Sequence, residues 1–446
     1  DLTLYVTHHY VTVIYVHPAT RDFTLQRVRV RAVAWAFLGD PVSGATGRGA
    51  RSVDFSASDL GPVVYLDGCN NYRIVDNDLL GTSTLISTGS NQPGVAQLGG
   101  GLATNGIIAR NTLWNANAAH WLDSVKQVIF EWNTVRPGGA EVSWGSNLDN
   151  YSPGYCQHVY HAHNHFQHVY AGDREAMTTD PVTGDYFGGA LVGSSGGGVE
   201  LTLRDGIGAA DPSNVGGAVS VLDGTGAGQY RRVVHVSNGT SLRLDAAFDT
   251  PLDSTSRVQV GRFKGRFLFW ANTYEDCGGF QFYANVVDGV VARHRFVRAE
   301  ALLSWGRATS SAGHVYAPNL RVQFTENTVV EGNHLWNWNG SYPYPHPKTV
   351  EPYFIGVLGS DQDSQPCEPY PHGAKGPCTP SAPAAWQGPI NQLVVIQRNR
   401  VLNNGGVVVR GHTANVLVEA NVMLNSSVQR VHVNRTHASN VLVAEG

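Results

Sequence analysis

The stretch TYEDCGGFQFYANVVDGVVARH (273–294) aligns without gaps with RVLNNGGVVVRGHTANVLVEAN (400–421). The paired glycines coincide, and both stretches end on an apolar run followed by a polar residue, 22 residues after the preceding equivalent. The same spacing of 22 residues separates Asn111 from Asn133, each of which also follows a short apolar run. A fixed period of this length indicates a repeat architecture, in which each unit buries its apolar face only by packing on its neighbours.

Each repeat reads as short alternating strands separated by Gly and Asn turns, without the spacing of a leucine-rich repeat. We therefore expect coils of a parallel β-helix, stacked about 4.8 Å apart. The recurrent Asn has a physical role in such a stack, because side-chain amides can hydrogen-bond to one another along its axis. The pattern resembles the right-handed parallel β-helix proteins of the pectate-lyase-like superfamily, which carry such Asn ladders. The resemblance covers roughly residues 60–180 and 262–446.

The predicted fold is all-β, a right-handed parallel β-helix with one inserted block. Residues 1–60 fit the period poorly and are expected to cap one end. Residues 61–180 and 263–446 are the two parts of the helix. Between them, residues 181–262 are rich in Gly-punctuated strands and predict a small β-barrel or sandwich. The Pro-rich segment 341–389 is expected to be a long ordered loop laid over the helix.

Composition argues against some classes of partner, and the resemblance suggests a compartment. The net charge of −4 gives no electrostatic case for nucleic acid or an anionic membrane. Membrane insertion is not expected either, because no apolar run approaches 18 residues. The chain starts at Asp1 without Met or a signal peptide, which suggests a processed form or a fragment. The resemblance implies an extracellular or cell-surface location.

Cysteines and sequons give further expectations of covalent chemistry. Cys367 and Cys378 are close enough in the Pro-rich segment to pair as a disulfide. The total of five cysteines leaves at least one thiol free or bonded between chains, which is compatible with self-association. The candidate glycosylation sites are the Asn residues of the N-x-S/T sequons: Asn150, Asn238, Asn339, Asn425 and Asn434.

Counting from the ladder position predicts which side chains face outward, because successive strand residues alternate between faces. In GGFQFYAN, the apolar Phe280 and Phe282 should point inward, and Gln281 and Tyr283 outward. The same count sends Trp121 inward. It sends a further set outward: His120, Asp173 and Glu175. Arg174 is then expected to point toward the interior or along the turn.

A second column of polar residues lies four positions after successive ladder positions: His168, Asp276, Arg298 and Glu331. If the inserted block leaves the stack unbroken, Asp276 and Glu331 are two coils apart, on the order of 9–10 Å. Inverting glycosidases hold their acid and base about 6.5–9.5 Å apart, so this pair is compatible with hydrolysis. The alternative is that both carboxylates balance Arg298 in a surface charge ladder.

Two other motifs have competing interpretations. The run Asp173-Arg174-Glu175 is either part of a reaction centre or an ion-paired turn where the inserted block leaves the helix. The alternating His161, His163 and His165 suggest a metal site, although neighbouring His side chains more often stack or hydrogen-bond. We therefore assign no metal ligands and no cofactor; calcium is compatible with the chain but not indicated by it.

The resemblance implies a groove along one face that holds an extended polysaccharide. Glycoside hydrolysis, slightly favoured over lyase chemistry, would use an acid and a base carboxylate. The candidate catalytic residues are Asp173, Glu175, Asp276, Arg174 and His168. The candidate substrate-binding residues are His120, Tyr170, Gln281, Tyr283, Arg298 and Glu331. The alternative function is a non-catalytic structural or adhesive component of a surface filament or spike.

Overall fold

The computed structural model describes most strand regions of the chain. The described residues are 2–6, 12–32, 62–81, 84–88, 101–115, 118–137, 146–149, 156–169, 175–179, 187–203, 214–237, 241–261, 263–309, 315–332, 353–361, 389–403, 405–425, 430–434 and 438–444.

Three long parallel sheets make up most of the molecule, and consecutive strands enter them in a fixed rotation. Sheet A contains β1 (Leu2–Val6), β4 (Val28–Ala32), β7 (Asp78–Leu80), β10 (Thr112–Asn115), β13 (Thr134–Pro137), β16 (His165–Gln167), β25 (Thr273–Glu275), β28 (Arg295–Ala299), β32 (Thr328–Gly332), β35 (Arg400–Val401) and β38 (Val422–Met423).

Sheet B contains β2 (Ile14–Val16), β5 (Val64–Leu66), β8 (Ile86–Thr88), β11 (His120–Asp123), β14 (Ser146–Asp149), β17 (Glu175–Thr178), β26 (Gly279–Tyr283), β29 (Leu302–Thr309), β33 (Ile355–Asp361), β36 (Val407–Gly411) and β39 (Val431–Val433). The short β30 (Val315–Ala317) pairs antiparallel with β29.

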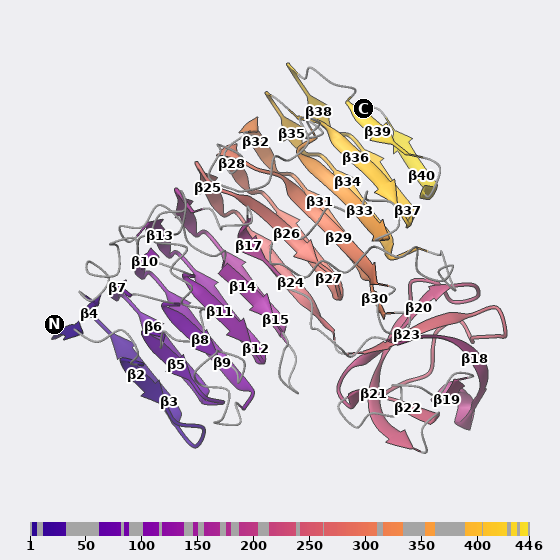
Figure 1. The fold of residues 1–446 in the computed structure, drawn as a ribbon, viewed down its shortest axis with the longest axis horizontal. Coiled ribbons are helices and arrows are strands. Elements are labelled where there is room, and N and C mark those ends of the chain that lie inside the picture. Colours follow the sequence, from indigo (N-terminus) through magenta and orange to yellow (C-terminus); the bar gives the residue numbers. More distant parts are fainter. Residues whose placement is uncertain are drawn as a thin grey trace, which may run out of the picture.

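Sheet C contains β3 (Arg21–Gln26), β6 (Asn70–Val75), β9 (Ala103–Ala109), β12 (Val125–Glu131), β15 (Gln157–Ala162), β24 (Lys264–Trp270), β27 (Val286–Ala292), β31 (Asn319–Thr325), β34 (Asn391–Gln397), β37 (Thr413–Glu419) and β40 (Ala438–Ala444). We call one strand from each sheet, taken in the order C, A, B, a coil. The two chain termini lie at opposite ends of the stack of coils (Figure 1).

The prediction of an all-β chain dominated by parallel sheets is confirmed. Each strand pairs with the equivalent strand of the next coil; for example, Phe267 of β24 lies opposite Gly289 of β27. One core of Val, Ile, Leu, Phe and Cys side chains runs between the sheets from Val16 to Met423. No helix in the described part of the chain is long and apolar enough to span a membrane.

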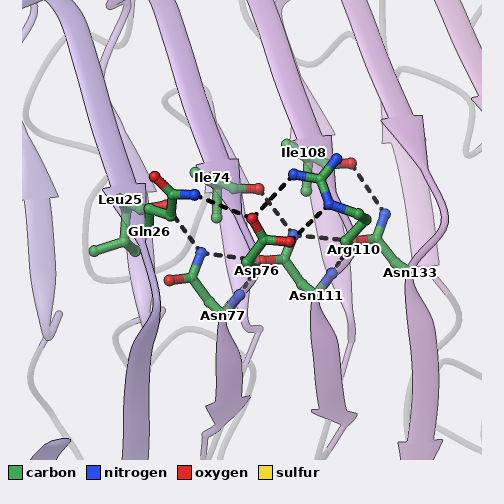
Figure 2. Close-up of polar contacts among 9 residues, drawn as sticks. All are labelled: Leu25, Gln26, Ile74, Asp76, Asn77, Ile108, Arg110, Asn111 and Asn133. Carbon is green, nitrogen blue, oxygen red and sulfur yellow. Dashed lines mark hydrogen bonds and ion pairs between the residues drawn. The ribbon is translucent and has the colours of Figure 1, made fainter. Parts of the chain in front are cut away.

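An Asn ladder joins the coils at the turn between sheets C and A. The side-chain amide of Asn111 donates to Asn133 Oδ1 at 2.9 Å and to the carbonyl of Ile74, also at 2.9 Å. Figure 2 shows this repeating pattern from Asn77 to Asn133. Each amide thereby satisfies buried backbone groups of the neighbouring coils, which would otherwise cost free energy. The expected ladder is present.

His294 occupies one ladder position in place of Asn. Its Nε2 lies 3.1 Å from Nδ2 of Asn272, and its backbone N–H donates to Asn327 Oδ1 at 2.9 Å. The imidazole therefore contacts the ladder on the Asn272 side, and the backbone N–H of His294, not its ring, makes the bond to Asn327. Burial lowers the pKa of His294 from 6.5 to about 3, so the ring is neutral in the folded protein at ordinary pH.

The inserted block is a closed barrel of six strands. Its strands are β18 (Phe187–Ser195), β19 (Glu200–Leu203), β20 (Ala218–Asp223), β21 (Tyr230–Ser237), β22 (Ser241–Leu244) and β23 (Arg257–Gly261), with the 3-10 helix η3 (Gly196–Gly198) after β18. The barrel lies beside the middle of the stack (Figure 1). The stack continues across the insertion, because β15, β16 and β17 pair directly with β24, β25 and β26.

Two segments of the chain differ from the predicted cap and the predicted loop. Residues 2–32 contribute β1 to β4 to the three sheets, so these strands belong to the stack itself. The segment 341–389 is not entirely a loop, because it contains β33, a strand of sheet B that pairs with β29 and β36. The Gly- and Pro-rich sequence around it hid this strand. Cys367 and Cys378 lie outside the described residues.

Candidate functional site

The predicted column of His168, Asp276 and Arg298 is present at the turn after sheet A. Each of these residues has a positive φ, near 50°, at the same place in three successive coils. The hydrogen bonds His168 N–H to Glu275 O and Asp276 N–H to Val297 O align the three turns. Glu331 follows in the next coil, opposite Val297 of β28. The insertion leaves this register unbroken, as the prediction required.

Asp276 and Arg298 form the strongest contact of this column. Arg298 Nε donates to Asp276 Oδ1 at 2.5 Å and Nη2 donates to Oδ2 at 2.8 Å. The Asp276 side chain is only 13% exposed, against 41% for Arg298. His168 Nδ1 lies 4.0 Å from Asp276 Oδ2 on the other side. The hydrogen bond from Arg298 lowers the pKa of Asp276, and Asp276 raises that of Arg298.

Glu275 adds a second carboxylate that the sequence did not single out. Its Oε2 lies 3.2 Å from His165 Nε2 and accepts a bond of 3.2 Å from Gln167 Nε2. Its Oε1 lies 3.5 Å from Arg298 Nη2. The bonds from Gln167 and His165 lower the pKa of Glu275. Glu275 could have been found by reading the outward positions along sheet A, because β25, which carries Glu275, pairs with β16, which carries His165 and Gln167.

We call His165, His168, Glu275, Asp276 and Arg298 the charged corner. It holds two ionised carboxylates, one guanidinium and two imidazoles on adjoining coils. A carboxylate with a lowered pKa can accept a proton or bind hydroxyl groups, but it is poorly suited to donate a proton near neutral pH. The two carboxylates of the corner are therefore suited to act as a base and not as a carboxylic acid. A carboxylic acid for glycoside hydrolysis would have to come from a neighbouring segment.

The outer face of sheet B adjoins the charged corner through β26. Tyr283 and Trp305 lie side by side on this face, with ring centroids 5.3 Å apart. Gln281 points outward as predicted, yet it is 4% exposed and donates to Thr178 Oγ1 at 3.1 Å. The face therefore combines two partly exposed aromatic rings with a covered amide. Tyr283 is the last residue of β26, so the rings lie one strand length along sheet B from the corner's charges.

The prediction for His120 is wrong. Sheet B aligns Trp121 with Asn147, Thr178 and Gln281 in turn, so Trp121 points outward and His120 inward. His120 is fully buried, with its Nε2 3.3 Å from His161 Nε2. The reason is turn length: sheet B is reached one residue later after Asn111 than after Asn272, and a one-residue slip reverses every side chain.

The register of β17 against β26 also differs from the one predicted by counting residues from the ladder Asn. Thr178, not Asp173, aligns with Gln281, because the turn after β16 is longer and a bulge lies between Glu175 and Met177. Glu175 begins β17 opposite Gly279, a short distance along the chain from Asp276. The expectation that Glu175 shares the strand position of Tyr283 is therefore wrong. Asp173, Arg174 and Tyr170 lie outside the described residues.

The three alternating His residues do not converge. His161 is buried and stacks on Phe130 with centroids 4.7 Å apart, and burial holds its pKa far below 6.5. His163 stacks on Trp132 at 4.3 Å, and His165 contacts Glu275. The ladder turn at Asn164 separates their directions. Among the described residues, no three His, Cys, Asp or Glu side chains form a set that could hold a metal ion.

Two of the five sequons lie in the described part of the chain. Asn425 and Asn434 are both exposed, and Asn425 Nδ2 donates to Asn403 Oδ1 at 3.0 Å. The other three sequon Asn residues lie outside it: Asn150, Asn238 and Asn339. The chain matches no family model, and no curated protein resembles its sequence at a significant level.

Proposed function

We propose that the chain is a right-handed parallel β-helix protein of the pectate-lyase-like kind that acts outside the cell on a polysaccharide. The observation that carries the proposal is the charged corner at one end of β26, with the aromatic pair Tyr283 and Trp305 one strand length away on the outer face of sheet B. Ionised Glu275 and Asp276 can accept hydrogen bonds from sugar hydroxyl groups, and Tyr283 and Trp305 offer flat apolar rings to a sugar face. Repetition along the coils suits an extended chain of sugars.

Glycoside hydrolysis is the favoured chemistry. Water attacks the anomeric carbon, a carboxylate base takes a proton from that water, and a carboxylic acid protonates the departing oxygen. Asp276, ionised beside Arg298, has the protonation state of the base. Asp173 or Glu175 would supply the acid, since β17 pairs with β26 just beyond Asp276. Lyase chemistry is second, because the described cation of the corner, Arg298, is held by Asp276 rather than offered to a uronate.

A non-catalytic structural or adhesive role is the alternative, and one contact favours it. Both oxygens of Asp276 are bound by Arg298, which is the pairing expected of a structural charge ladder. Under this interpretation the corner strengthens the stack and presents a surface for assembly.

The test is incubation with a panel of neutral and acidic polysaccharides, with new reducing ends and the ultraviolet absorbance of unsaturated uronates followed together. Variants Asp173→Asn, Glu175→Gln and Asp276→Asn are compared with wild type. Asp76→Asn is the matched control, because Asp76 also forms a two-bond pair with an arginine, Arg110, but on a different turn.

Reducing ends without absorbance, lost in the first three variants and kept in Asp76→Asn, support the hydrolase. Absorbance would replace it with a lyase. No product from wild type on any polysaccharide would overturn the enzymatic proposal and leave the structural role.

A further inference from the structure

A second polar cluster lies where the barrel meets the outer face of sheet C. Every strand of sheet C contains one residue with positive φ that kinks the strand, and His158 and Arg266 are the kink residues of β15 and β24. Because these strands are paired neighbours, their kinks stack and both side chains project from the sheet as exposed groups. Lys126 lies on β12, the neighbour of β15 on the other side.

The barrel orients Arg266 at this junction. Arg266 Nε and Nη2 each lie 3.4 Å from the hydroxyl oxygen of Tyr230 on β21, and its Nη1 lies 3.2 Å from His158 Nε2. Tyr230 in turn donates to Asp288 Oδ2 at 2.6 Å, and Arg321 takes the other oxygen of Asp288 at 2.9 Å. The two carboxylate oxygens of Asp288 therefore contact Tyr230 and Arg321. Among the described residues, the hydrogen-bond partners of Arg266 are the hydroxyl of Tyr230 and the ring of His158.

Positive charges outnumber negative ones at this junction, where Asp288 is paired with Arg321 and bonded to Tyr230. Burial and then the positive charges of Arg266, Lys126 and Arg232 lower the pKa of His158. Arg232 belongs to β21 of the barrel, so both parts of the molecule contribute cations. Within the described residues, neither Lys126 nor Arg266 forms an ion pair with a carboxylate. In a chain of net charge −4, such a concentration of positive charge favours a bound anion.

An aromatic ring lies beside the cations. Tyr160 follows His158 on β15 and is partly exposed on the same outer face, between Ile129 of β12 and Leu268 of β24. Burial and then the negative charge of Glu131 raise the pKa of Tyr160. Glu131 is the last residue of β12, whereas Lys126 is near its start. A flat ring next to a group of cations matches a sugar that carries a negative group, since the ring contacts the sugar face and the cations bind its charge.

We propose that Lys126, His158, Arg232 and Arg266 form an anion-binding junction between barrel and sheet C that holds a carboxylate or sulfate group of an acidic polysaccharide. The inference rests on the proposed carbohydrate function and narrows its substrate to an anionic polymer. The junction lies on sheet C, whereas the charged corner lies at the turn between sheets A and B, so it is a second contact with the polymer. The inserted barrel then has a role, which is to complete this site.

The experiment measures equilibrium binding of the full chain to polygalacturonate, dextran sulfate and uncharged dextran at low salt. The main variant is Lys126→Gln, because among the described residues Lys126 forms no hydrogen bond or ion pair with the barrel. Arg266→Gln is the second variant, and circular dichroism and melting temperature check its folding. Arg400→Gln is the control, since it removes one exposed positive charge from sheet A.

Each variant at the junction should weaken binding of at least one charged polymer about tenfold, the size expected for one lost charge-assisted contact. Arg400→Gln and uncharged dextran should show no such change. If only the binding of polygalacturonate is weakened, the ligand group is a carboxylate. If only the binding of dextran sulfate is weakened, the ligand group is a sulfate. Equal binding of charged polymers to Lys126→Gln and Arg400→Gln would overturn the junction, as would absence of any binding by wild type.

The two proposals fail separately. If uncharged polysaccharides are bound or cleaved and the junction variants change nothing, the junction is wrong and the proposed function stands. If charged polymers bind through Lys126 while no polysaccharide is cleaved and Asp276→Asn has no effect on binding, the junction stands and the role of the charged corner falls.

Discussion

The guanidinium of Arg298 binds both carboxylate oxygens of Asp276 across two adjacent coils, with Nε 2.5 Å from Oδ1 and Nη2 2.8 Å from Oδ2. The two residues occupy the same place in successive repeats, 22 residues apart in the sequence. A pair that bridges coils in this way ties the stack together, and it also fixes the charge of the candidate site.

Asp276→Asn should lower the free energy of unfolding by about 1 kcal/mol at pH 7, a modest loss because solvent screens the 41% exposed Arg298. The folded-state pKa of Asp276 is lowered below 3.8, so its stabilisation is present above that pH and is lost as the pH falls through the folded-state value. Urea unfolding at pH 7 and pH 3 measures the difference between wild type and variant, which should shrink at pH 3.

Asp76→Asn is the control for this pair, because Asp76 and Arg110 are both more exposed than Asp276. We expect a smaller loss of stability at pH 7 from this change. A loss at least as large as that of Asp276→Asn would contradict the view that partial burial strengthens the Asp276–Arg298 pair.

His294→Asn should stabilise the protein, because it restores the amide of the ladder between Asn272 and Asn327. The folded-state pKa of His294 is lowered from 6.5 to about 3, so the unfolded chain binds the extra proton between these values. Stability therefore falls as the pH drops below about 6.5, and the variant removes this part of the fall. Melting temperatures from pH 7.5 to pH 5 should decline less steeply in the variant.

His161 keeps some pH dependence in the His294→Asn protein, because it is also buried with a lowered pKa. The reverse change, Asn111→His, is the matched control and should destabilise the protein. An unchanged slope of melting temperature against pH in His294→Asn would show that His294 does not carry the proton linkage.

Asn111→Ala should lower the free energy of unfolding by about 3 kcal/mol, since it leaves buried hydrogen-bonding groups without partners. The Asn111 side chain accepts two bonds from Asn77 and donates to Ile74 and Asn133. Asn421→Ala, near the end of the ladder and only partly buried, should cost about 1 kcal/mol. Urea unfolding of both variants checks the order, and equal losses would count against a cooperative interior ladder.

Tyr230→Phe should loosen the barrel from sheet C without unfolding either part. The hydroxyl of Tyr230 bonds to Asp288 and Arg266, while its ring packs with Phe263 at a centroid distance of 5.7 Å. Hydrogen exchange of amides in β20 and β21 should speed up about tenfold, as expected for loss of one hydrogen bond to a charged group. Tyr160→Phe is the control and should leave exchange in the barrel unchanged; unchanged exchange in Tyr230→Phe would argue for docking by apolar contacts alone.

Much of the fold could be predicted from repetition. The 22-residue period of the sequence predicts the positions of the ladder Asn and the parallel strands. The place where that period is interrupted predicts the boundaries of the inserted block. The column from His168 to Arg298 followed as well, because a constant distance from the ladder carries over from coil to coil. Glu331 departs from it, since an irregularity in the pairing of β28 with β32 sets it opposite Val297. His120 and Glu175 did not follow, because the turns before β11 and β17 have different lengths and the sequence does not state the register.

By itself, the sequence determined the period, the residue type at each ladder position and the side chains available at each turn. Only the tertiary structure decided which of them meet. The contact of Glu275 with His165 joins residues 110 apart across the barrel insertion, and the cations around His158 come from sheet C and the barrel together. Such neighbours are set by strand register and by docking of one part on another, which depend on the packing of the whole chain rather than on local spacing.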